Sequence, residues 1–304
     1  MIWNLIYRLS PWLQATLVLG VVLAVALLLQ ALIVRMVPSQ SRRAHNELLG
    51  HTAGIAGVIN AVLLAFIVFA AWTDYDRARD VVSQEVSLVT DILRDVEAVS
   101  SVHDSVVHGL QGYLAAVIDS EWTVMRAGAP QDAQGRTGFG PGWRTLNRSY
   151  SLALELNAST SLQKTVAEEL VKRFNSLFDV RRQRIAYASY GALTPTVWGV
   201  VLAGGIVSIA CCGLFGVESH RLHIASTGLV AVSFGLVFFL IISLQWPFRG
   251  HTQITVDPYC RAWNSVDRDE RAEAAEKQLA WTPSPRPARC PARAPRPAPA
   301  ATRP

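Results

Sequence analysis

Two groups of side chains in this sequence have residue types and a spacing that could bind a metal ion. Glu218, His220 and His223 lie close together, and one helical turn could present both imidazole rings to a cation. The second group is acidic, is interleaved with arginines, and comprises Asp74, Asp76, Asp80 and Glu85. We favour polar residues at the membrane interface for the first group and a solvated helix face for the second. We therefore predict no metal site.

Sequence motifs of common catalytic sites are absent: the chain has no G-x-S-x-G elbow, no phosphate-binding glycine loop and no H-E-x-x-H pair. The spacing of the cysteines is typical of neither a zinc site nor a disulfide framework, so we expect all four to be reduced: Cys211, Cys212, Cys260 and Cys290. We therefore expect no catalytic residues and no cofactor, and an enzyme ranks third among the functions considered.

Asn60 is the polar side chain of most interest, because it lies in the middle of an apolar block with Gly54 and Gly57 before it. An amide in hydrocarbon requires a hydrogen-bond partner, and small residues allow helices to approach closely. We favour helix packing for these three residues, and a position lining a pore remains the alternative.

Four apolar blocks must position these residues, and they define the class of protein. Of the 304 residues, 51% are hydrophobic and 17% charged, whereas soluble domains carry about a quarter charged residues. The blocks are residues 12–34, 52–72, 195–215 and 224–246, and each has the roughly 20 residues that a bilayer requires. The connections within each pair are short, which favours antiparallel hairpins. The sequence thus predicts an all-α integral membrane protein with four transmembrane helices in two hairpins and an inserted cytosolic helical hairpin or bundle.

The arginines indicate the orientation in the membrane. On the side that holds both termini and residues 73–193 there are eight near the membrane: Arg8, Arg77, Arg79, Arg181, Arg182, Arg184, Arg249 and Arg261. The opposite side has four: Arg35, Arg42, Arg43 and Arg221. The positive-inside rule then predicts that both termini are in the cytoplasm. We expect a multi-pass protein of the plasma membrane.

The segment between the hairpins has a helical repeat, and we expect the helix of the second apolar block to continue into it after Trp72. Apolar residues alternate steps of three and four at Val82, Val86, Val89, Leu93, Val96, Val107, Leu110, Leu114 and Val117. This pattern predicts a coiled-coil or bundle seam. A loop is expected over 127–142, and helices over 143–156 and 162–186. The predicted divisions are an N-terminal transmembrane hairpin at 1–72, a cytosolic helical segment at 73–193, a C-terminal transmembrane hairpin at 194–250 and a cytosolic tail at 251–304.

The tail explains the positive charge. Its last stretch alternates Pro, Ala and Arg and accounts for a formal net charge of +5, so the rest of the chain is about neutral. We expect a short charged helix over 267–277 and disorder from about residue 283. No basic folded face with aromatic residues accompanies these arginines, and we therefore predict no binding to nucleic acid.

Two stretches resemble a known family. The second apolar block with its exit, GVINAVLLAFIVFAAWTDYDRARDVVSQEVSLV, resembles the bestrophin-like domain family of unknown function. The helix opening at Pro195 and Trp198 and the exit with Pro247, Phe248 and Gly250 are similar to that family as well.

The resemblance implies a relation to bestrophins, which are pentameric anion channels with cytosolic helical domains. The chain lacks the acidic run of the bestrophin calcium clasp, so calcium gating is not expected. We expect a homo-oligomeric channel for small ions in the lipid bilayer. The alternative is a membrane-anchored helical scaffold or sensor whose cytosolic hairpin binds a protein partner.

Overall fold

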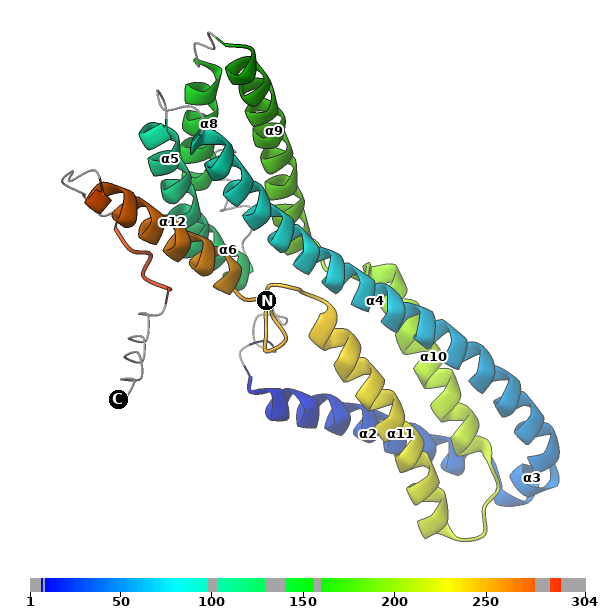
Figure 1. The fold of residues 1–304 in the computed structure, drawn as a ribbon. Coiled ribbons are helices and arrows are strands. Elements are labelled where there is room, and N and C mark those ends of the chain that lie inside the picture. Colours follow the sequence, from blue (N-terminus) through cyan, green and yellow to red (C-terminus); the bar gives the residue numbers. More distant parts are fainter. Residues whose placement is uncertain are drawn as a thin grey trace, which may run out of the picture. The chain divides into compact units, whose positions relative to one another are not determined.

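The computed structural model describes residues 7, 9–97, 103–128, 140–155, 160–276 and 285–290. All regular secondary structure in these ranges is helical (Figure 1). The chain divides into two compact units, Met1–Val82 with Gln183–Ile254, and Ser83–Arg182 with Thr255–Pro304. We call the first the membrane unit and the second the helical unit.

Four helices of the membrane unit are long and apolar enough to cross a bilayer: α2 (Pro11–Met36), α4 (Asn46–Glu97), α10 (Pro195–Leu214) and α11 (His220–Leu244). Helix α3 (Ser39–Ala44) lies in the connection between α2 and α4. Helix α4 continues past the apolar block into the helical unit without interruption, as the sequence predicts. The all-α membrane fold with four spanning helices is confirmed.

Side-chain oxygens cap three of the spanning helices at their N-termini. Ser10 Oγ accepts a hydrogen bond from the Leu13 amide at 3.4 Å, and Ser219 Oγ accepts one from the Leu222 amide at 3.4 Å. Thr194 caps α10, and Pro195 occupies its first turn as expected from the sequence. A cap satisfies an amide that has no partner inside the helix, and a proline in the first turn has no such amide to satisfy.

Close helix contacts hold the membrane unit together. At Gly235 of α11 an added Cβ would lie 3.4 Å from Leu19 Cα of α2, and at Gly213 of α10 it would lie 3.4 Å from Gln30 Cα. Small residues at such crossings allow two backbones to approach, which is how helices associate in a bilayer. A buried apolar cluster accompanies these contacts and includes Leu64, Leu193, Val201, Phe238 and Ile241.

The helical unit contains the rest of α4 together with α5 (His103–Ala116), a π-helical turn η1 (Val117–Glu121), α6 (Trp122–Ala127), α8 (Pro141–Leu154), most of α9 (Ser161–Ser189) and α12 (Asp257–Glu276). Polar groups fix its interior. Arg181 Nη2 of α9 lies 2.6 Å from Glu121 Oε1 of η1, with side chains only 2% and 0% exposed. At Gly142 of α8 an added Cβ would lie 2.2 Å from Glu121 Oε1. A larger residue at position 142 would therefore displace the Glu121 carboxylate from its place in the ion pair.

The buried stripe of α4 in the helical unit differs in part from the predicted seam. Val89 and Val96 are fully buried as expected, but Ile92 is buried in place of Leu93, which is half-buried. Glu85 is also fully buried, and its carboxylate accepts a hydrogen bond from the Tyr113 hydroxyl of α5. The repeat predicted a purely apolar seam, whereas the bundle places a carboxylate in it because α5 offers a donor at that level.

The C-terminal segment is more ordered than its composition suggests. Helix α12 begins at Asp257, ten residues before the expected start at 267, because Tyr259, Cys260 and Trp263 bury one face of the helix. Cys260 and Cys290 form a disulfide, so the expectation that they are reduced is wrong for this pair. The disulfide positions residues 285–290, which lie within the segment expected to be disordered; residues 291–304 lie outside the described ranges.

We expect Ile92→Asp to destabilise the helical unit, because a carboxylate at a fully buried position without a counter-charge is strongly destabilising. The melting temperature in detergent should fall by about 5 °C or more. The control is Thr90→Asp, an exposed position on the same helix. Equal melting temperatures for the two variants would contradict this description of the α4 stripe.

Candidate functional site in the membrane unit

Asn60 joins α4 to α10 inside the apolar core. Its side chain is 6% exposed, and its Nδ2 donates a hydrogen bond to Ser208 Oγ at 3.1 Å. Its Oδ1 lies 2.2 Å from the position that a Cβ on Gly204 would occupy. The glycine therefore leaves the space that the amide fills. Such interhelical hydrogen bonds in membranes contribute roughly 0.6–2 kcal/mol.

Gly54 and Gly57 lie on a different part of α4, where a Cβ would meet no atom within 4 Å. Gly54 and Gly57 therefore do not share the packing contact that Asn60 makes with α10. Gly57 is at one end of an open groove of about 940 Å³ between α4 and α11. The groove is almost entirely apolar and is lined by Gly57, Ala61, Leu64, Ala65, Val68, Phe69, Trp72, Ser233, Phe234, Val237 and Leu240. For Gly54, Gly57 and Asn60, helix packing stays a prediction, with a position lining a pore as the alternative.

Two further side-chain amides of the spanning helices are buried, and the sequence pattern predicts no role for them. Gln30 of α2 is 3% exposed, and both polar atoms of its side chain lack a hydrogen-bond partner among the described residues. Gln14 of the same helix is 3% exposed, and its Nε2 also lacks a partner there. Burial of an unpaired amide is costly. The only sequence signal for these positions is a glutamine inside an apolar block.

The end of α11 is fixed to the start of α10 by Gln245. Its Nε2 donates to Leu193 O at 3.0 Å, and its Oε1 accepts from the Leu193 amide at 3.2 Å. The Ala192 amide donates to the backbone oxygen of Gln245 at 2.9 Å. A Cβ at Gly191 would lie 2.3 Å from Gln245 Nε2, so a larger residue there would displace the Gln245 amide. The sequence does not predict these hydrogen bonds, because Gln245 and Leu193 are 52 positions apart.

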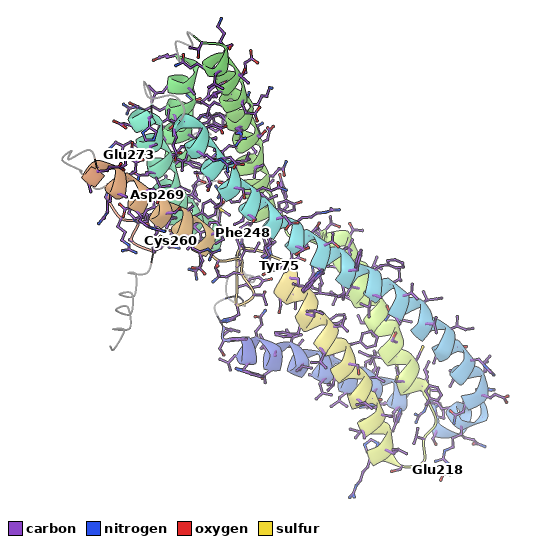
Figure 2. All side chains as sticks on the ribbon, viewed as in Figure 1. Tyr75, Glu218, Phe248, Cys260, Asp269 and Glu273 are labelled. Carbon is purple, nitrogen blue, oxygen red and sulfur yellow. A yellow bond between two sulfur atoms is a disulfide. The ribbon has the colours of Figure 1, made fainter. Side chains whose placement is uncertain are left out.

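The group Glu218, His220 and His223 is divided among different contacts. Glu218 lies in the connection that precedes α11 (Figure 2), and its carboxylate is 3.4 Å from Arg43 Nη1. His223 is buried, and its Nε2 lies 3.1 Å from the Cys212 carbonyl oxygen, to which it can donate. His220 is exposed. These contacts agree with polar residues at a helix end rather than with a metal site.

The acidic group on α4 is spread around the helix. Asp76 and Asp80 are exposed, and Asp74 lies 4.0 Å from Arg77 one turn away. Glu85 faces the interior of the helical unit. Near this level Tyr75 donates from its hydroxyl to the Thr252 carbonyl at 2.6 Å, which fixes the segment after α11 to α4 (Figure 2). The three aspartates are therefore surface residues of α4, and Glu85 makes one buried hydrogen bond.

Comparison with known proteins identifies similar sequences and structures. The family model of the Bestrophin-like domain matches residues 20–259. The fold is similar to the crystal structure of a bacterial bestrophin homologue from Klebsiella pneumoniae carrying a point mutation, with 13% identity, 84% of this chain and 98% of that chain covered, and a TM-score of 0.58. A second structure of the homologue from this bacterium has 12% identity, coverage of 85% and 98%, and a TM-score of 0.55. No curated protein sequence matches the chain.

We expect Gly204→Ala to destabilise the membrane unit, because the added methyl group would collide with the Asn60 amide. Overpacking of this kind costs about 1–3 kcal/mol. Gly199→Ala on the same helix is the matched control, since a Cβ there meets no atom within 4 Å. Thermal unfolding in detergent measures both. A Gly204→Ala protein as stable as Gly199→Ala would show that Asn60 does not pack against α10.

Proposed function

Because the chain belongs to the Bestrophin-like domain family, we propose that it is a homo-oligomeric membrane channel for small ions. The observation that carries this proposal is the extent of the family match, which includes α4, α10, α11 and most of α2. The similarity of the fold to bacterial bestrophin homologues supports the same conclusion. The bestrophins to which the family is related are channels, and this relation favours a channel over an enzyme.

The uncovered faces of the membrane unit support an assembly of several copies. Ile55, Ile59 and Phe66 of α4 are 66%, 57% and 68% exposed. The groove between α4 and α11 presents small residues, including Gly57 and Ala61, next to bulky ones. Small residues on a spanning helix allow a second helix to approach closely. We propose that neighbouring copies cover part of this surface and that lipid covers the remainder.

In this proposal α4 lines the ion path, with Gly54 and Gly57 facing it or the neighbouring copy. Asn60 then has a positioning role, because its hydrogen bond with Ser208 fixes the rotation of α4 against α10. An apolar path can stop ions where it is narrow, because water leaves a narrow hydrophobic constriction. We therefore propose gating by small movements of α4 rather than by calcium.

The alternative function is a membrane-anchored scaffold or sensor whose helical unit binds a cytosolic protein. The sequence feature that supports it is the apolar seam that begins on α4. Much of that seam is buried inside the helical unit itself. The seam residues of this unit that are at most 3% exposed are Val89, Val96, Val107, Leu110, Leu114 and Val117. Less of the seam is therefore left for a partner. Oligomeric mass and ion flux distinguish the two functions, since a scaffold requires neither an oligomer nor ion flux.

We further propose that the protein lies in the plasma membrane with both termini and the helical unit in the cytoplasm. The arginine distribution supports this orientation. The Cys260–Cys290 disulfide opposes it, because disulfides are rare in a reducing cytosol. The side of the membrane that holds the helical unit can be measured directly with reporter fusions.

The channel proposal predicts ion flux through purified protein in liposomes. Gly57→Cys and Gly54→Cys, each with Cys211 and Cys212 replaced by serine, should lose most of that flux after treatment with a charged, thiol-reactive reagent. The bulky charged adduct would obstruct a path lined by α4. Chloride and potassium gradients, measured separately, would give the selectivity.

Gly199→Cys in the same serine background is the control, because Gly199 is equally uncrowded but lies on α10. Its flux should be unchanged by the reagent. Equal inhibition of all three variants would reject α4 as the lining. A monomeric protein by mass measurement, with no flux of either ion, would reject the channel and favour the scaffold.

The orientation predicts opposite results for reporter fusions after Gln40 and after Ala133. A reporter active only in the cytoplasm should work after Ala133, and one active only outside it should work after Gln40. Reversed results would place the helical unit outside the cytoplasm. Identical results at both positions would contradict the number of spans between them.

A further inference from the structure

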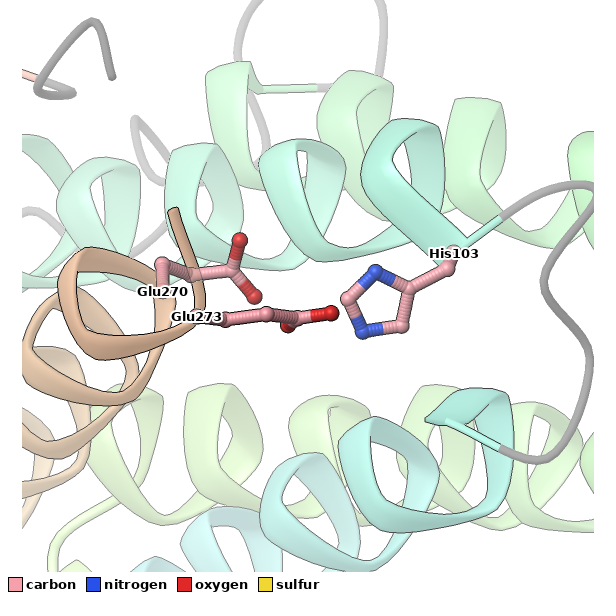
Figure 3. Close-up of side chains that lie close together, drawn as sticks. All are labelled: His103, Glu270 and Glu273. Carbon is pink, nitrogen blue, oxygen red and sulfur yellow. The ribbon is translucent and has the colours of Figure 1, made fainter. Parts of the chain in front are cut away.

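A cluster of three side chains in the helical unit, distant in sequence, has the composition of a metal site. His103 comes from the first residue of α5, and Glu270 and Glu273 come from α12 (Figure 3). One ligand atom from each lies within 4.8 Å of the others, and all three residues are half-buried. We propose that His103, Glu270 and Glu273 bind a divalent transition-metal cation of the zinc type and thereby fasten α12 to α5.

The backbone brings these ligands together for definable reasons. Glu270 and Glu273 are three residues apart on a helix, so both carboxylates project from one face. Trp122 packs edge-on against Tyr259 of α12 with ring centroids 5.5 Å apart, which places this helix against the α5–α6 segment. Residues 285–290 add a second attachment, through the Cys260–Cys290 disulfide and through Asp119, which accepts hydrogen bonds from the Ala288 and Arg289 amides at 3.2 and 3.4 Å.

The ligand types select the class of cation. An imidazole nitrogen suits zinc and its neighbours among the transition metals, whereas magnesium and calcium prefer oxygen ligands alone. Zinc–nitrogen and zinc–oxygen bonds are about 2.0–2.2 Å, so donors within 4.8 Å of one another reach a common cation after small side-chain rotations. Three protein ligands leave one tetrahedral position, which water can fill.

Asp104 lies where it can orient the imidazole ring of His103. Its Oδ1 lies 3.0 Å from His103 Nδ1, and the His103 side chain is only 14% exposed. Metal-binding histidines commonly donate one ring N–H to a carboxylate, which fixes the tautomer and leaves the other nitrogen for the metal. With the proton on Nδ1, the Nε2 lone pair of His103 is available to a cation. Asp104 is then a positioning residue.

The charge around the cluster also favours a cation. Carboxylates held together in a half-buried position repel each other, and a dication relieves that repulsion. The site is separate from the calcium clasp of bestrophins, because this chain lacks the corresponding acidic run and the present ligands include a histidine.

The proposal predicts that the full-length protein in detergent, stripped with chelator and dialysed, binds one Zn²⁺ per chain in titration calorimetry. His103→Ala and the isosteric Glu270→Gln and Glu273→Gln should lose that binding or weaken it more than tenfold. Asp104→Asn should keep the stoichiometry but weaken affinity by about tenfold, as expected for a residue that orients a ligand. Added Zn²⁺ should also slow hydrogen exchange in α12 of the unaltered protein and not in Glu273→Gln.

Two variants serve as matched controls. Glu276→Gln removes the same charge from an exposed position of α12, and His220→Ala removes an exposed imidazole of the membrane unit. Both should bind Zn²⁺ like the unaltered protein. The proposal is overturned if stoichiometric Zn²⁺ binding is absent, if it survives in Glu270→Gln and Glu273→Gln, or if His220→Ala abolishes it. None of these results depends on ion flux, so the channel proposal is tested separately.

Discussion

Hydrocarbon offers a peptide group no hydrogen-bond partner, and the membrane unit is built around this constraint. A spanning segment must satisfy its backbone internally, which leaves the helix as the only form for each of the four apolar blocks. The same constraint acts on side chains. Asn60 satisfies it through Ser208, whereas Gln30 is buried with its amide unpaired among the described residues. Glycines at the crossings allow helices to pack closely where hydrophobic burial gives no advantage over lipid.

The helical unit has the opposite chemistry, because its interior includes charged groups. The Glu121–Arg181 pair is almost completely buried, and desolvation offsets much of the attraction between such charges. What the pair provides is a definite arrangement: η1, α8 and α9 meet at Glu121, and a larger residue at position 142 would displace its carboxylate. Loss of either partner would leave a buried charge alone, which is far more costly than the pair itself.

Helix α12 is the element through which the C-terminal segment contributes to the helical unit. An aromatic contact, a disulfide and the proposed metal site act at successive points along or beside it. Two of these three attachments respond to the chemical environment, since a disulfide depends on redox conditions and a metal site on cation supply. The strength with which α12 is held is therefore open to control from outside the chain.

Composition and periodicity by themselves determined the membrane class, the four spanning helices and the uninterrupted passage of α4 beyond the bilayer. These follow from local properties: apolar length, short connections, and a proline or threonine at a helix start. The family could also be identified from short motifs near the second and last spans.

Only the tertiary structure decided which polar residue meets which. The repeat on α4 predicted Leu93 where Ile92 is buried, because a 3.5-residue pattern does not fix the rotation of a helix relative to its neighbours. The burial of Glu85 depends on a tyrosine 28 positions away, and the cluster of His103 with Glu270 and Glu273 brings together residues at least 167 positions apart. Such contacts leave no periodic signal in one sequence, because packing determines them after the helices have formed.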